Sequence, residues 1–160
     1  MEWSSGIRNE NNRFKIMRII IQTDGGSRGN PGPSAIGVVI FQEGQILKKY
    51  GESIGQTTNN QAEYEAVIFA LKKAKLLFGK KKAKEMEIEF RVDSELLVKQ
   101  MNHQYKIKEK DLQLLFIKIW NLILDFKSVN FKHVRREENK EADEMVNQTL
   151  DNQDREQSLL

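Results

Sequence analysis

The chain has 160 residues, of which 39% are hydrophobic and 31% are charged, and its net charge is +3. This length suits one globular domain, and this apolar content excludes a disordered chain. No apolar run approaches the ~20 residues that a membrane helix needs, and the absence of cysteine excludes disulfides and thiolate metal sites. Without the apolar segment of a secretory signal, the sequence predicts a cytoplasmic protein that does not associate with membranes.

The beginning of the chain predicts a leader and then a group of strands. Residues 1–15 are polar and are expected to form a loose leader to a single domain over 16–150. The β-branched run 17–22 predicts a buried strand, and the glycines and prolines that follow it predict a sharp turn. Two more strands are expected over 36–41 and 46–51, and their short connections favour antiparallel hairpins.

The rest of the chain alternates between helical and strand periodicity. Thr58 or Asn59 is expected to cap the first long helix, and Ser94 a short one. Trp120 is expected to pack against the core, and residues 151–160 to form a polar tail. The predicted elements are a helix over 58–79, a strand over 86–92, helices over 94–101 and 112–123, a strand over 129–134 and a helix over 137–150. Three hairpin strands followed by this alternation predict an α/β fold with a mixed sheet. Its first strand should pair antiparallel with the second and parallel with the fourth.

Four acidic residues fall where this layout brings strand ends and helix starts together. Asp24 ends the first strand and Asp93 the fourth, whereas Glu63 and Asp143 lie in helices. Ligand sites in open α/β sheets lie beyond the carboxyl ends of strands. Carboxylates gathered there repel one another unless a cation neutralises them, and their oxygens suit Mg²⁺ or Mn²⁺. Taken singly, Asp93 can belong to a helix cap and Glu63 can favour a helix dipole.

Four segments together resemble the motifs of the type 1 ribonuclease H family, and they occur in the family's order. They are TDGGSRGNPGP at 23–33, TNNQAEY at 58–64, VDSELLVKQM at 92–101 and HVRREENKEAD at 133–143. The compact last motif is most similar to that of the archaeal and bacterial ribonuclease H-like branch. The resemblance implies a ribonuclease H-like fold, with a five-stranded mixed sheet in the order 3-2-1-4-5 and helices on both faces. It also implies an endonuclease that hydrolyses the RNA strand of RNA/DNA hybrids, leaving 3′-hydroxyl and 5′-phosphate ends.

The resemblance further implies a site with two Mg²⁺ ions, for which Mn²⁺ can substitute. Asp24 would bridge the ions, Glu63 and Asp93 would share the leaving-group ion, and Asp143 would hold the ion that carries the attacking water. His133 has the spacing of a family histidine that assists turnover. Arg136 has the spacing of an arginine that replaces this histidine in the archaeal-type branch, so both residues are candidates.

Contacts to the hybrid are expected from residues around the motifs. Small or amide side chains let the backbone approach the RNA strand and read 2′-hydroxyl groups. Asn139 is similar to a family asparagine near the site, but a loop or cap role explains it equally well. The expected substrate-binding residues are Gly25, Gly26, Ser27, Asn59, Asn60, Gln61 and Asn139.

A cluster of lysines is a second possible source of contacts to nucleic acid. It can neutralise phosphates, or it can be the solvated face of a helix and its exit loop. The cluster comprises Lys72, Lys73, Lys75, Lys80, Lys81, Lys82 and Lys84.

Two alternatives to a hybrid-specific nuclease stay open. A broader nuclease would also cut double-stranded RNA, and nothing in the sequence separates these substrates. A non-catalytic nucleic-acid-binding module would keep the fold, but carboxylates without metal repel phosphate and add nothing to binding. In either case a monomer is expected.

Overall fold

The computed structural model describes residues 16–160, so the expected leader at 1–15 lies outside the described residues. The strands are β1 (Met17–Ser27), β2 (Gly32–Gln42), β3 (Gln45–Thr57), β4 (Met86–Val92) and β5 (Ser128–His133). The helices are α1 (Asn59–Phe78), α2 (Lys80–Ala83), α3 (Glu95–Met101), α4 (Lys110–Ile123) and α5 (Lys140–Ser158), with a short 3-10 helix at Arg136–Glu138. None of the described helices has the length and apolarity needed to span a membrane.

The five strands form one mixed sheet in the order β3-β2-β1-β4-β5, which confirms the predicted fold. Strand β1 is central and pairs antiparallel with β2 and parallel with β4. Ile21, for example, lies beside Ile40 of β2 and Phe90 of β4. Strand β5 extends the parallel half, and β3 extends the antiparallel half.

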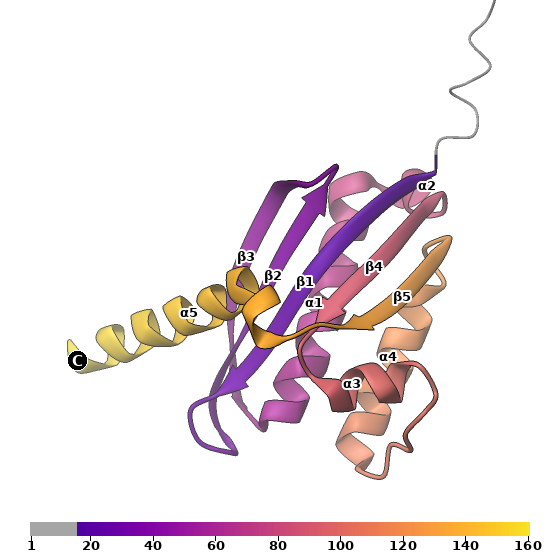
Figure 1. The fold of residues 1–160 in the computed structure, drawn as a ribbon. Coiled ribbons are helices and arrows are strands. Elements are labelled where there is room, and N and C mark those ends of the chain that lie inside the picture. The colour runs from indigo at the N-terminus through magenta and orange to yellow at the C-terminus, as the bar shows by residue number, and fades with distance from the viewer. Residues whose placement is uncertain (1–15) are drawn as a thin grey trace, which may run out of the picture.

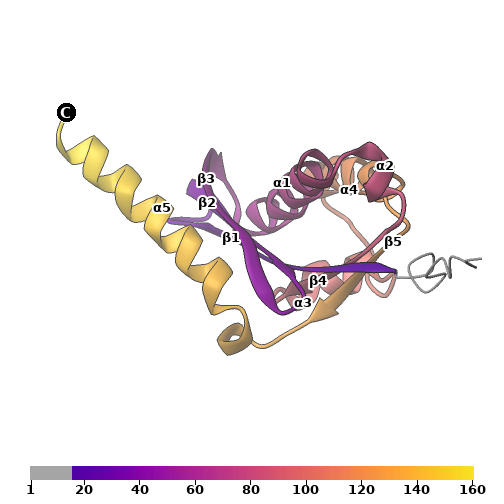
Figure 2. The same cartoon turned by 90° about the horizontal axis from the view of Figure 1, so that it is seen from above.

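Helices cover the two faces of the sheet unequally. Helices α1 and α4 lie on one face, and α5 crosses the other over β1, β2 and β3 (Figures 1 and 2). Ile19 and Ile21 alternate along β1 and are fully buried in the core with Leu71 of α1. On the other face, Val146 and Leu150 of α5 pack with Ala35 of β2 as a smaller cluster. The end of β1 therefore lies between α1 and α5.

Close packing of α5 on the sheet depends on the lack of a side chain at Gly37 in β2. A Cβ atom at this position would collide with the carbonyl oxygen of Ala142 in α5 and lie 3.1 Å from the Cβ of Met145. Because the obstacle is backbone, the helix itself would have to move away from the sheet. Gly37 therefore fixes the distance of α5, and of Asp143 within it, from the sheet.

Several elements differ in length from the predicted ones. Strand β1 continues five residues past Gln22 and β3 continues to Thr57, because the hairpin ladder pairs polar and glycine residues as well as apolar ones. Helix α5 continues through Ser158, so eight of the residues expected as a polar tail are helical. Only the last residues after Ser158 lie outside it.

The expectation that Trp120 packs against the core is wrong, because 59% of its surface is exposed. Leu112, Leu115 and Ile119 occupy the buried face of α4. Trp120 follows Ile119 directly, and one residue along a helix turns the side chain by about 100°, toward solvent.

We expect Gly37→Ala to lower the free energy of unfolding by about 2–4 kcal/mol, because the added methyl group meets backbone. Gly44→Ala is the matched control: Gly44 has a φ of 76° but open space around its Cβ position, so only backbone strain of about 1 kcal/mol is added. Urea unfolding of the two variants checks the difference. Equal losses would contradict a packing role for Gly37.

Candidate active site

Three of the four expected carboxylates meet where β1, β4 and α1 come together. Thr23 and Val92 are paired in the parallel strands β1 and β4, so Asp24 and Asp93, which follow them, lie side by side. Glu63 comes from the start of α1. Carboxylate oxygens of Asp24, Glu63 and Asp93 all lie within 4.8 Å of one another.

The start of α1 is fixed by a capping box and by Gly25. The Thr58 hydroxyl accepts from the Gln61 N–H at 3.2 Å, and the Gln61 side chain accepts from the Thr58 N–H at 3.0 Å. A Cβ atom at Gly25 would collide with the Ala62 carbonyl, because α1 touches β1 at this point. The expected glycine thus has a packing role that holds Glu63 beside Asp24.

Asp143 reaches the site from the other face of the sheet. It lies in the first turn of α5, where its N–H donates to the Asn139 carbonyl at 3.2 Å. Asp143 lies outside the group of three, but its negative charge raises the pKa of both Asp24 and Asp93. The structure therefore brings all four predicted carboxylates into one electrostatic environment.

Burial and mutual repulsion make these groups hard to ionise. Burial, and then the charge of Asp93, raises the pKa of Asp24 from 3.8 to about 7. Burial, and then the charge of Asp24, raises the pKa of Glu63 well above its usual 4.5. Burial also raises the pKa of Asp93, against the opposing effects of Asn139, Arg136 and His133.

The donor set fits a divalent cation. The Glu63 Oε2 atom is buried without a hydrogen-bond partner among the described residues, although a buried carboxylate oxygen normally has one. A cation would pair with this oxygen and offset the repulsion between the carboxylates. Oxygen-only ligands select hard ions such as Mg²⁺ or Mn²⁺ over thiophilic metals.

Asn139 lies beneath the site and is completely buried. Its side-chain amide donates to the Thr23 carbonyl at 2.9 Å, and its proximity lowers the pKa of Asp93. Nearby, the Gln22 amide donates to the Glu138 carbonyl at 3.1 Å. These two bonds tie Glu138 and Asn139, directly before α5, to the neighbouring β1 residues Gln22 and Thr23. The sequence analysis did not select Gln22, although a polar residue directly after three isoleucines in a buried strand indicates a hydrogen-bonding role.

His133 and Arg136 both lie on the Asp93 side of the site. His133 ends β5, and its Nε2 atom is 3.3 Å from the Asp93 carbonyl oxygen. Arg136 lies in the 3-10 helix and is exposed. Each lowers the pKa of Asp93, Arg136 more strongly than His133. The geometry keeps both as candidates.

Of the residues expected to contact substrate, some have exposed side chains, and others are held by hydrogen bonds or close packing within the protein. The Ser27 N–H donates to the Asn59 Oδ1 atom at 2.9 Å, which joins the β1–β2 loop to the start of α1. Asn59 is exposed and Asn60 half-buried. Gln61 is engaged in the capping box and donates to Asp111 at 3.2 Å. Gly26 approaches α5, with Val146 3.3 Å from its Cβ position.

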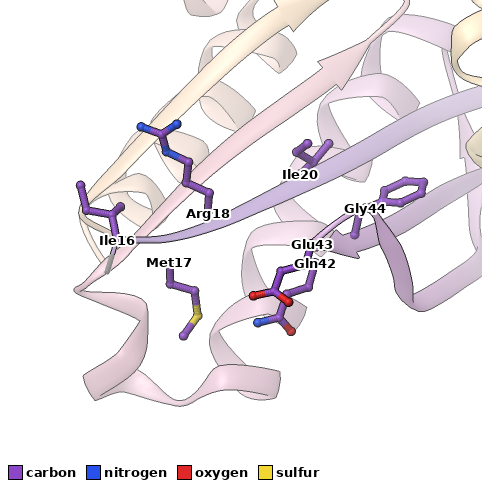
Figure 3. A pocket seen from close by; sticks show the side chains of 8 residues that line it. Ile16, Met17, Arg18, Ile20, Gln42, Glu43 and Gly44 are labelled. Carbon is purple, nitrogen blue, oxygen red and sulfur yellow. The ribbon is translucent and has the colours of Figure 1, made fainter. Parts of the chain in front are cut away.

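One pocket and most of the lysine cluster lie away from the carboxylates. A pocket of about 400 Å³ is lined by Ile16, Met17 and Glu43, at the opposite end of β1 from Asp24 (Figure 3). The exit of α1, where most of the clustered lysines lie, is also distant. With a rise of 1.5 Å per residue, residues beyond Phe78 are more than about 20 Å along α1 from Glu63.

The sheet order and the carboxylate cluster define a domain of the ribonuclease H-like class. The Reverse transcriptase-like family matches residues 22–149. LC11-RNase H1, solved in complex with an RNA/DNA hybrid, is 49% identical, with a TM-score of 0.80 over 84% of this chain and 97% of that one. RNase H1 from Halobacterium salinarum is 39% identical, with a TM-score of 0.77 over 84% and 98%. The chain belongs to the type 1 ribonuclease H family.

Curated relatives of this chain include a ribonuclease HI, but these proteins are longer than the region that the chain matches. Ribonuclease HI of Halobacterium salinarum is 39% identical over 135 residues, which are 84% of this chain and 65% of that protein. A bifunctional protein of Mycobacterium tuberculosis is 36% identical over 137 residues. The chain spans only 36% of the mycobacterial protein's length.

We expect Asp24→Asn to stabilise the metal-free protein at neutral pH. An acid whose pKa is raised on folding contributes stability that is lost as pH rises from its unfolded value, 3.8, to about 7. In chelator at pH 7.5 the variant should gain about 4 kcal/mol, or roughly 8–16 °C in Tm, and the gain should nearly vanish by pH 4. Thermal scans at both pH values check this. Mg²⁺ should raise the Tm of the parent protein more than that of the variant, and the reverse order would contradict the assignment.

Proposed function

We propose that the protein is an endonuclease that hydrolyses the RNA strand of RNA/DNA hybrids, leaving 3′-hydroxyl and 5′-phosphate ends. The observation that carries the proposal is the meeting of Asp24, Glu63 and Asp93 within 4.8 Å, with Asp143 beside them. Binding alone gains nothing from such a cluster, because it repels phosphate and is costly to bury. A cytoplasmic location and a monomeric state stay predictions of the sequence.

We propose that Asp24, Glu63, Asp93 and Asp143 hold two Mg²⁺ ions, for which Mn²⁺ can substitute. When bound, such ions supply an activated water and stabilise the leaving oxygen. The chain's own part is to hold the carboxylates close together before a metal binds: Gly25 lets Glu63 lie beside Asp24, and Asn139 ties the start of α5 to β1. This arrangement limits the rearrangement needed on metal binding.

The residues proposed to read the RNA strand either follow Asp24 (25–27) or precede Glu63 (59–61) in the chain, and together they are called the rim of the site. Ser27 and Asn59 are joined by a hydrogen bond and lie where β1 ends and α1 begins. The Asn59 and Asn60 amides offer donors for 2′-hydroxyl groups, which distinguish RNA from DNA. Gly25, Gly26 and Gln61 support this rim through packing and capping.

The proposal is tested by cleavage of one labelled RNA strand, annealed to DNA, annealed to RNA or left single. We expect cutting of the hybrid with Mg²⁺ or Mn²⁺, none with EDTA, and a loss of at least about 10³-fold in Asp24→Asn. Cutting of the RNA duplex as well would replace the proposal by the broader nuclease. Binding of the hybrid without cutting under either metal would replace it by the binding module.

A separate pair of variants decides between His133 and Arg136. Arg136 has the stronger electrostatic effect on Asp93, so we expect Arg136→Ala to lower kcat about 10- to 100-fold and His133→Ala less than about 3-fold. Single-turnover and steady-state rates on the same hybrid separate cleavage from product release. A large loss in His133→Ala with little change in Arg136→Ala would reverse the assignment.

A further inference from the structure

The last two turns of α5 form an arm whose packing differs from that of the rest of the helix. Ala142, Val146 and Leu150 place the first part of α5 on the sheet. From Asp151 onward the helix is polar and mostly exposed, and it extends past the edge strand β3 (Figures 1 and 2). These turns also lie beyond the residues that the family matches, which end at 149. Apolar burial therefore does not explain why the helix continues.

Arg28, in the loop between β1 and β2, is bound by this arm. Its Nη2 atom donates to Asp151 and its Nη1 atom donates to Asp154. The two aspartates are three residues apart, so they lie on the same side of the helix and share one guanidinium group. The Ser53 hydroxyl of β3 adds a further bond to Gln153 at 3.2 Å.

The loop that carries Arg28 is otherwise held from the opposite side. Ser27 is bonded to Asn59 of α1, and the Asn59 N–H donates to the Asn30 Oδ1 atom at 3.0 Å. The Arg28 N–H closes the loop by donating to the Pro33 carbonyl at 2.8 Å. Residues 28–31 are exposed and bury no apolar side chain. The Ser27 hydroxyl also donates to the Thr57 carbonyl of β3 at 3.0 Å, so polar bonds to α1, to the end of β3 and to the arm fix the loop.

We propose that Asp151 and Asp154 are positioning residues that, through Arg28, hold the β1–β2 loop in the conformation that receives the RNA strand. The inference rests on the proposed function, because it places the RNA strand at Ser27 and Asn59. The arm does not contact the carboxylates, which are secured separately by Gly25 and Asn139. Loss of the bonds between Arg28 and the two aspartates therefore weakens substrate binding and leaves the chemical step unchanged.

The test compares Asp151→Asn/Asp154→Asn and Arg28→Ala with the unmodified protein on a labelled hybrid. We expect KM to rise about 3- to 10-fold in both variants with kcat unchanged, and the triple variant to show no further rise. The effect should shrink at high salt, where exposed ion pairs are screened. Glu52→Gln/Glu156→Gln removes the same charge from exposed positions on β3 and α5, and its KM should stay unchanged at matched ionic strength.

Hydrogen exchange of the Arg28 amide, measured without substrate, tests the arm independently of any cleavage. The Asp151→Asn/Asp154→Asn variant should exchange this amide faster, while amides in the core of β1 keep their protection. An unchanged exchange rate, an unchanged KM or a fall in KM would overturn the inference. A fall in KM would mean that the aspartates hold Arg28 away from phosphate. Unmodified protein that cuts no hybrid would instead refute the proposed function, whatever the exchange result.

Discussion

Repulsion between carboxylates is the constraint around which this structure is arranged. Oxygens of Asp24, Glu63 and Asp93 lie within 4.8 Å in a partly buried site, where each negative charge raises the cost of the next. A chain free to relax would separate them. They stay together because each is attached to an element that cannot move independently: Asp24 and Asp93 to paired central strands, and Glu63 to a helix locked against β1. The stability of the sheet and its core offsets this local repulsion.

The central strand makes a site with contributions from both faces of the sheet possible. At the end of β1, α1 approaches from one face and α5 from the other, and each does so at a glycine: Gly25 faces α1, and Gly37 of β2 faces α5. A larger residue at either position would move a helix and, with it, one carboxylate. The same local sequence therefore serves packing and chemistry. This dual role explains why glycines expected to admit the RNA backbone turn out to be in contact with helices.

The sequence was sufficient to predict what depends on periodicity and on local chemistry. The pairing of β1 with β2 and β4, a cap at Ser94 and a gathering of acidic residues at strand ends followed from alternation, helix spacing and cap residues, whereas the full strand order was implied by the family resemblance. Features that depend on partners distant in the chain were not predictable. The extra helical turns after Leu150 are held by Arg28, which is more than a hundred residues away. Trp120 is exposed because Leu112, Leu115 and Ile119 occupy the buried face of α4. The sequence of this helix alone does not show which of its apolar residues face the core.

Asn139 shows how burial separates two roles that sequence alone leaves equal. The resemblance placed it among the substrate contacts, and a cap or loop role was the alternative. In the structure its side chain is fully buried and donates to the Thr23 carbonyl, and its own carbonyl accepts from the Asp143 N–H. The residue thus connects the strand position next to Asp24 with the first turn of the helix that carries Asp143. Its side chain would have to give up the bond to Thr23 before it could contact an RNA strand, and doing so would release the start of α5 from β1. Burial and these bonds therefore favour Asn139 as a residue that holds Asp24 and Asp143 in place, whereas the exposed Asn59 is the more accessible residue for the proposed contact to RNA.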